Sequence, residues 1–209
     1  MNQRIGEHRA CDGDTTDHRR RRRPRAGHAL AAGLVALLSL SGCATGATAG
    51  GMTVTNAEIV APKNPAVERA VTVGEMGGGS STNPLWTSKV GNEDFKTALT
   101  ESLRLAGMLA DGAGRYTLKA SLVSLDQPLV GFDMTVTATV QYSVTDMRTG
   151  AVVWQETVAT PHTARVAESF LGTTRLRLAN EGAVRKNIAQ LIERLGGASL
   201  QAQGAVSLK

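Results

Sequence analysis

Apolar and polar residues alternate without a break over fourteen positions in the middle of the chain, Phe132–Thr145. A two-residue period puts the apolar side chains on one face of a β-strand and the polar ones on the other, which indicates a sheet with one buried and one wet face. Arg115–Asp126 begins with the same alternation, and Ala151–Thr160 continues it. Because the connections between these stretches are short, they predict three consecutive antiparallel strands.

Two other stretches carry the 3.6-residue period of an amphipathic helix. In Asn92–Gly107 the apolar side chains recur every three or four residues, and asparagine and glycine stand where a helix begins and ends. A second helix is expected to begin between Thr173 and Asn180 and to end at the glycine pair 196–197. Each helix therefore has an apolar stripe to bury.

The region before the first helix is less regular. Val67–Val73 alternates and is the best candidate for a first strand, whereas Met52–Val60 could form another. The glycines at 77–79 lack the following helix and the Lys-Ser/Thr pair of a phosphate-binding loop, so we expect a loose loop there. Pro161–Thr173 is expected to be irregular, or to contain a short edge strand around Val166–Phe170.

These elements predict an α+β fold in the order β-α-β-β-β-α. We expect a two-layer sandwich in which an antiparallel sheet of about four strands is covered on one face by the two helices. The order of the strands within the sheet stays open. A single domain is expected over residues 52–197, followed by a loose tail over 198–209.

A short apolar run, Ala29–Leu40, precedes all of these elements. It is too short to cross a bilayer, which takes roughly 20 apolar residues. A dense basic run, Arg19 to Arg25 broken only by Pro24, comes before it, and small residues follow it. This succession of basic, apolar and small residues is typical of an export signal.

Leu40-Ser41-Gly42-Cys43 resembles the lipobox of bacterial lipoproteins. The resemblance implies cleavage between Gly42 and Cys43, removal of residues 1–42 as a signal peptide, and acylation of Cys43 by palmitate-type chains. Residues 43–51 would then be the lipidated cysteine and a flexible, glycine-rich tether. Ala44 stands where an aspartate would resemble an inner-membrane retention signal, so the resemblance implies the periplasmic face of the outer membrane. The inner membrane and the cell surface are the alternatives.

The net charge of the chain changes when the signal is set aside. The whole chain carries +5, but residues 1–42 hold 8 Lys+Arg and 4 Asp+Glu, which leaves about +1 for the rest. The basic pI therefore belongs to the signal and does not indicate a nucleic-acid partner. Of the two cysteines, Cys11 lies in the signal and Cys43 in the lipobox, so we expect no disulfide within one chain.

A second resemblance lies in the turn between the last two strands. Asp146-x-x-Thr149-Gly150-x-x-Val153-Trp154 is similar to a hairpin in small α+β domains of Gram-negative envelope lipoproteins, among them transport-auxiliary and assembly-factor lipoproteins. It spans nine residues. Together with the lipobox, it implies an accessory lipoprotein of the envelope.

The residues after the signal offer little for catalysis or metal binding. His162 is the one histidine left, and no nucleophile-elbow sequence accompanies it. A zinc site needs three or four ligands, drawn mainly from Cys, His and carboxylates. We therefore expect a surface histidine, no metal, no cofactor and no enzyme activity.

Two sets of residues are candidates for a partner surface. In the loop after the first meander strand, apolar side chains could mark a partner site or tuck over the sheet edge. Near the last helix, basic side chains could contact anionic headgroups or simply form a solvated face. The candidates are Gln127, Pro128, Leu129, Val130, Arg175, Arg177, Arg185 and Lys186.

The leading interpretation is a periplasm-facing, membrane-anchored accessory protein that supports an envelope assembly, transport or cell-wall complex through protein contacts. A lipid- or glycan-binding carrier with a pocket between helices and sheet is the alternative. A third possibility, an envelope hydrolase or acyltransferase, lacks any motif in this sequence.

Overall fold

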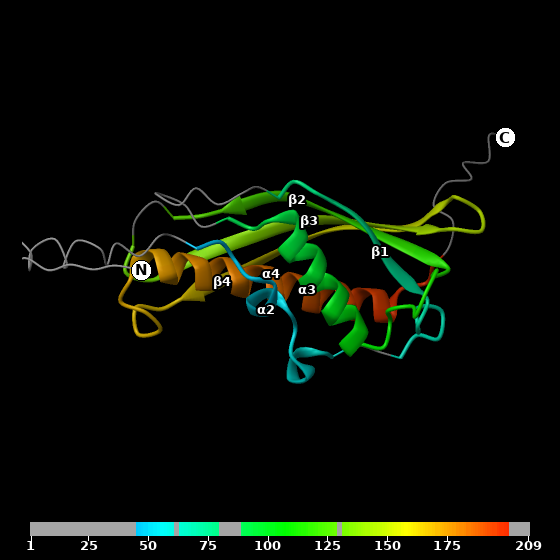
Figure 1. The fold of residues 1–209 in the computed structure, drawn as a ribbon, viewed down its shortest axis with the longest axis horizontal. Helices are drawn as coiled ribbons and strands as arrows, with labels where there is room; N and C mark the ends of the chain where they lie inside the picture. The colour runs from blue at the N-terminus through cyan, green and yellow to red at the C-terminus, as the bar shows by residue number, and fades with distance from the viewer. Residues whose placement is uncertain (1–44, 61–62, 80–88, 129–130, 201–209) are drawn as a thin grey trace, which may run out of the picture. The chain divides into compact units, whose positions relative to one another are not determined.

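The computed structural model describes residues 45–60, 63–79, 89–128 and 131–200, so the sequence that resembles a lipobox and the predicted C-terminal tail from residue 201 lie outside the described residues. Four strands and three α-helices make up this part of the chain (Figure 1). In chain order, the elements are α2 Ala49–Met52, the 3₁₀ turn η2 Asn56–Glu58, β1 Val71–Gly77, α3 Asn92–Leu105, β2 Tyr116–Asp126, β3 Met134–Asp146, β4 Val152–Ala164 and α4 Gly172–Gly197.

The four strands form one sheet in the order β1-β2-β3-β4. The pairs β2–β3 and β3–β4 are antiparallel, which confirms the predicted meander. The pair β1–β2 is parallel, so the sheet is mixed and the expectation of an antiparallel sheet was wrong for its first strand. The reason is that α3 lies between β1 and β2 in the chain. This helix carries the chain back to the end of the sheet where β1 began, so β2 runs in the same direction as β1.

The helices all lie on one face of the sheet (Figure 1), and the α+β class and the two-layer arrangement are confirmed. The inward face of β3 is fully buried at every second position from Val136 to Val144, as its alternation predicts. The opposite face carries only half-buried or exposed side chains, mostly Thr, Ser and Gln.

Several predicted boundaries differ from the structure. The first strand, expected over Val67–Val73, is β1 at Val71–Gly77 and includes Gly77, which was expected in a loose loop. The last helix, α4, begins at Gly172, one residue before the expected range. Phe132, expected on the buried face, precedes β3 and is 85% exposed. β4 runs past Thr160 to Ala164 and includes Pro161, which an outer strand tolerates because its missing N–H need not pair. The chain then turns instead of forming a strand at Val166–Phe170, and the backbone N–H of Val166 donates to the Asp133 carboxylate at 3.0 Å.

The long helix α4 lies against β3 and β4 and is tied to them by polar contacts in the core. Asn187 is fully buried; its Oδ1 accepts from the Tyr142 hydroxyl at 2.8 Å, and its Nδ2 lies 2.8 Å from the Val158 carbonyl. Thr160 Oγ1 donates to the Ala183 carbonyl of α4 at 2.9 Å. These bonds satisfy buried polar groups that would otherwise be costly, and they fix the position of α4 along the sheet.

Residues 45–59 pack onto the helical layer and are not a loose tether or a strand. Ala47, Met52 and Val54 are buried, and the Val54 N–H donates to the hydroxyl of Ser102 on α3 at 3.0 Å. The expectations of a flexible segment up to residue 51 and of a strand over Met52–Val60 are therefore corrected for the described residues. Both rested on local composition, whereas the segment is ordered by partners far along the chain.

The two faces of β3 predict unequal losses of stability when the same charge is introduced. Val140→Asp should lower the free energy of unfolding by several kcal/mol, because it buries an unpaired carboxylate in the helix-covered core. Gln141→Asp, on the next residue and the exposed face, should cost only about 1 kcal/mol. Urea unfolding of both variants measures this contrast. Equal losses would show that the outer face is covered as well.

Candidate functional site

The first described residues are clamped onto α4 by a buried carboxylate. Glu181 is 4% exposed, and its Oε1 accepts from the backbone N–H and the hydroxyl of Thr48, both at 2.9 Å. Arg177, one turn earlier on α4, pairs with the same oxygen at 2.8 Å and balances its charge. Gly51 lies so close to this carboxylate that a Cβ would collide with it, which explains why a residue without a side chain is needed there.

A second contact holds the following residues of this segment to the same helix. Arg185 donates from Nη1 to the Gly51 carbonyl at 3.1 Å, and its Nε lies 3.3 Å from the Glu58 carboxylate. We call residues 45–59 together with Glu181 and Arg185 the N-terminal clamp. It fixes where the first described residues lie on α4.

The predicted basic surface is thus mostly engaged within the molecule. Arg177 and Arg185 hold the N-terminal clamp, and Arg175 is 7% exposed, with Nη1 donating to the Ser169 carbonyl at 2.7 Å. Lys186 is exposed. The structure therefore does not bring the four basic residues together as one free patch. Their role in partner binding remains a prediction.

The predicted loop after β2 is only partly described. Gln127 and Pro128 are half-buried, and Gln127 Nε2 donates to Oδ1 of Asn180 on α4 at 2.9 Å. Leu129 and Val130 lie outside the described residues, as do Gly42 and Cys43. Gln127 thus connects the end of β2 to α4.

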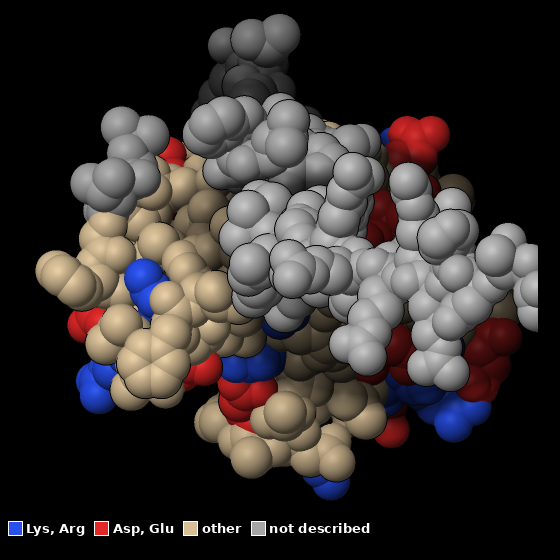
Figure 2. Space-filling view, turned by 60° about the vertical axis from the view of Figure 1, so that its left-hand side comes forward, with Lys and Arg blue, Asp and Glu red and all other residues tan. Residues whose placement is uncertain are grey.

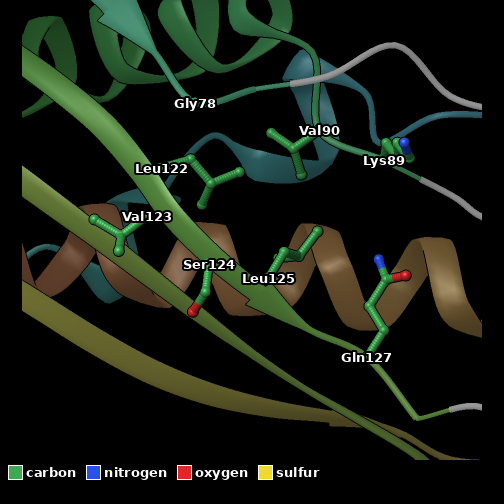
Figure 3. Close-up of a pocket in the computed structure, with 8 residues that line it drawn as sticks. All are labelled: Gly78, Lys89, Val90, Leu122, Val123, Ser124, Leu125 and Gln127. Carbon is green, nitrogen blue, oxygen red and sulfur yellow. The ribbon is translucent and has the colours of Figure 1, made fainter.

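A small hollow opens beside this loop. Leu122 and Leu125 of β2 and Val90, just before α3, point toward it, with Lys89 and Gln127 at its rim (Figure 3). Its volume of about 210 Å³ is below the roughly 300–1,000 Å³ of ordinary ligand pockets. The hollow therefore lends little support to a carrier that encloses a lipid.

A wider and shallower hollow of about 380 Å³ lies on the face of the sheet that none of the described helices covers. Its polar lining includes side chains from all four strands: Glu75, Lys119, Ser121, Gln141, Ser143 and Gln155. These groups can donate and accept hydrogen bonds but include no histidine or cysteine.

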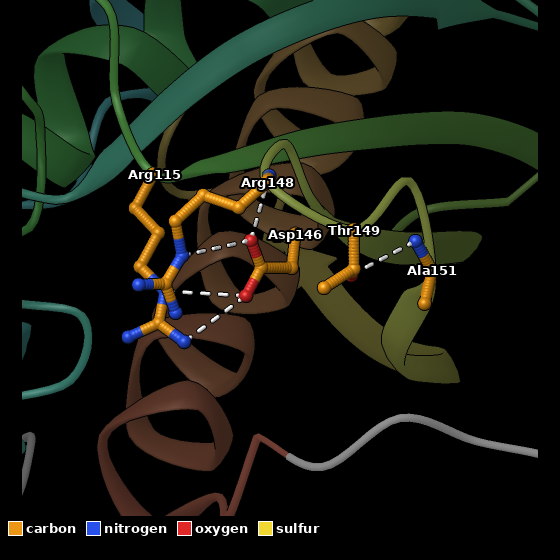
Figure 4. Close-up of polar contacts among 5 residues, drawn as sticks. All are labelled: Arg115, Asp146, Arg148, Thr149 and Ala151. Atoms are coloured by element: carbon orange, nitrogen blue, oxygen red, sulfur yellow. Dashed lines mark hydrogen bonds and ion pairs between the residues drawn. The ribbon is translucent and has the colours of Figure 1, made fainter.

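The hairpin that resembles those of envelope lipoproteins is held by Asp146. The Asp146 carboxylate accepts from the Arg148 backbone N–H at 2.9 Å and from Arg115 Nη2 at 3.0 Å, as Figure 4 shows. The Arg148 bond and, after it, the Arg115 contacts keep the pKa of Asp146 below its usual value. Gly150 takes a φ of 70°, which closes the turn at little cost. The residues of this motif therefore stabilise a turn.

His162 is not the surface residue that we expected. It is half-buried between β4 and α4, against Gly182, where a Cβ would collide with its ring. Burial, together with the positive charges of Lys186 and Arg185, lowers the pKa of His162 below its ordinary value. Because the His162 ring packs against the backbone of α4 at Gly182, its position is explained by the packing of the sheet against the helices.

Among the described residues, no group of three or more His, Cys, Asp or Glu side chains is placed to hold a metal ion. Within the same residues, no helix is long and apolar enough to span a membrane.

Sequence reasoning missed the N-terminal clamp. Thr48, Gly51 and Glu181 carry no local pattern that would pair them across more than a hundred residues.

No family model matches the chain, and no curated protein matches its sequence. Solved structures with a similar fold include a Xanthomonas campestris protein of the DUF330 family, at 13% identity over 66% of this chain and 92% of that chain, with a TM-score of 0.48. A minor lipoprotein from Acinetobacter baumannii is 11% identical over 63% and 94%, with a TM-score of 0.43. The L103M PelC dodecamer from Paraburkholderia phytofirmans is 16% identical over 64% and 91%, with a TM-score of 0.42. Likenesses of this size transfer neither activity nor partner to this chain.

The N-terminal clamp predicts a sharp difference between two adjacent glycines. Gly51→Ala should push the Glu181 carboxylate away from Thr48 and Arg177, so the free energy of unfolding should fall by about 1–3 kcal/mol. Gly50→Ala, which meets nothing within 4 Å, should be neutral or stabilise by up to about 1 kcal/mol. Thermal unfolding tests stability, and hydrogen exchange over residues 45–59 tests release of the segment. Unchanged exchange in Gly51→Ala would contradict the role given to Glu181.

Proposed function

We propose that this chain is a lipid-anchored accessory protein of a Gram-negative envelope that supports an assembly, transport or cell-wall complex through protein contacts and not through catalysis. The observation that carries the proposal is Leu40-Ser41-Gly42-Cys43, which resembles a lipobox and follows a basic and a short apolar run. Ala44, in place of an aspartate, supports delivery to the outer membrane, with the domain facing the periplasm.

The N-terminal clamp supports this proposal in a specific way. With only Ala44 between Cys43 and the first described residue, an acylated cysteine could extend at most ~7 Å from Thr45. The domain would therefore be held against its membrane with a restricted orientation. Such an attachment raises the effective concentration of the domain for neighbours on the same membrane.

The uncovered face of the sheet is the best surface for those neighbours. It presents hydroxyl and amide groups from β2, β3 and β4, with Lys119 and Glu75 beside them, and no helix of the described part of the chain lies in front of it. A polar, solvated surface of this kind is typical of the rim of transient protein interfaces. The same polar hollow keeps a glycan-binding role open as the second candidate.

The first test is the chemical state of Cys43. In protein extracted from membranes of a Gram-negative host, intact mass should show residues 1–42 missing and Cys43 acylated at the new N-terminus. Cys43→Ser should leave the unprocessed precursor, because the thiol that receives the lipid is gone. Cys11→Ser is the matched control and should be processed normally, since Cys11 leaves with the signal. An unmodified Cys43 thiol in membrane-extracted protein would refute lipidation.

The second test concerns the uncovered sheet face. A photo-crosslinking residue at Gln141, exposed in the polar hollow, should capture envelope proteins in living cells, because this face is expected to meet the partner. The control position is Lys96, an exposed residue of α3 in the helical layer. Mass spectrometry identifies the captured species. Equal protein capture at both positions would refute this face as the contact surface, and capture of glycan alone would favour the second candidate.

A further inference from the structure

Two loops at one end of the domain expose large apolar side chains. Phe132 and Phe170 are 85% and 90% exposed, and Leu171 beside Phe170 is 66% exposed. The chain has only three phenylalanines, so two of the three are in water in this structure. We call the loops 131–133 and 165–171 the aromatic tip. Large apolar side chains exposed at the same end of a domain are candidates for an interaction site.

The aromatic tip is held in place by polar contacts. Asp133 accepts from the Val166 N–H at 3.0 Å, which joins the two loops directly. Buried Arg175 donates to the Ser169 carbonyl at 2.7 Å, and the Arg165 N–H donates to the Glu168 carboxylate at 2.8 Å. The phenylalanines are therefore displayed by an ordered scaffold.

The start of the described chain runs toward the same end. Gly51 contacts Arg185 and Thr48 contacts Glu181, so the segment read backward approaches the first turn of α4. In Figure 1, its blue start lies at the end of α4 where that helix begins, and the loop after β4 lies at that end too. The aromatic tip adjoins this first turn, because Arg175 binds the 165–171 loop.

Chain length then limits where an anchoring membrane can be. Cys43 is five residues before Thr48, so it can extend no more than ~17 Å from that clamped residue. From Glu181 back to Gly172, the beginning of α4, the helix rises ~14 Å. These two lengths are nearly equal. A chain extended from Thr48 toward the beginning of α4 would therefore bring a bilayer that receives acyl chains on Cys43 to the level of the aromatic tip.

We propose that the aromatic tip inserts into the interfacial region of the bilayer that holds the acylated Cys43. This inference rests on the lipidation in the proposed function. Phenylalanine and leucine would lose their exposed area to the acyl boundary, and acyl chains with an apolar protein surface give firmer attachment than either alone. Figure 2 turns the left-hand side of Figure 1 forward and shows basic and acidic side chains among uncharged surface on the described part of that face.

Single labelled cysteines test the proposal in the lipidated, full-length gene product. Phe170→Cys and Phe132→Cys each add the one free thiol of the processed chain, and both sites are exposed enough to accept it. Met147→Cys is the control: it is 60% exposed at the far end of β3, which is ~40 Å long. Each protein carries an environment-sensitive fluorophore and is reconstituted in phosphatidylethanolamine–phosphatidylglycerol vesicles.

We expect labels at 132 and 170 to be quenched several-fold more by nitroxide lipids than the label at 147, and to be protected from aqueous iodide. If iodide reaches 170 as readily as 147 in vesicles, the bilayer is not the occupant, and protection appearing only in native envelopes would assign the tip to a protein. Lipid quenching at all three sites would also overturn the proposal, because the domain would then lie flat. Intact mass separates the two failures: without acylation of Cys43 the proposed function and the docking both fail, whereas with acylation only the docking does.

Discussion

Asn187 fixes how α4 lies across the sheet, and the other features of the domain depend on that position. Its amide nitrogen lies 3.1 Å from the Ala138 carbonyl, 2.8 Å from the Val158 carbonyl and 3.1 Å from the Thr160 hydroxyl. The Asn187 amide nitrogen has two hydrogens and three acceptors within reach, so both of its hydrogens can be bonded at all times. A shift of α4 by one residue would leave the amide buried without partners, which is costly in a core of low polarity.

Because α4 is held in this way, the side chains that it presents to residues 45–59 also have fixed positions. Glu181 and Arg185 lie one turn apart on α4, and they contact Thr48 and Gly51, which are close together in the clamped segment. The carboxylate is shielded from water but paired with Arg177, so its burial is compensated. The position of α4 in the core therefore also determines where Thr48 and Gly51 lie.

The sequence predicts the elements of this fold better than their long-range contacts. Alternation in β2, β3 and β4 and the helical period in α3 and α4 are local signals, and they led to the correct class and meander. The direction of β1 depended on a crossover, and the order of residues 45–51 depended on Glu181, more than 130 positions away. Arg175 and Arg185 resemble a solvent-facing basic patch when helix periodicity is considered alone, but each binds a segment outside α4. Phe132 was assigned to the core because it continues an alternating run, although the strand begins two residues later, and periodicity cannot tell where a strand stops.

The proposals for the anchor and for the uncovered face of the sheet constrain each other. If the aromatic tip meets the bilayer, β3 and β4 extend away from it by ~40 Å, and the polar face of the sheet stands beside the membrane, not against it. A partner on that face would then approach along the membrane surface. If Cys43 carries the lipid, the short connection to it would limit how far the domain can turn this face toward the lipid, because the N-terminal clamp holds the chain up to Thr48 on α4. Orientation at the membrane and access to the partner surface would thus both follow from where α4 holds residues 45–59.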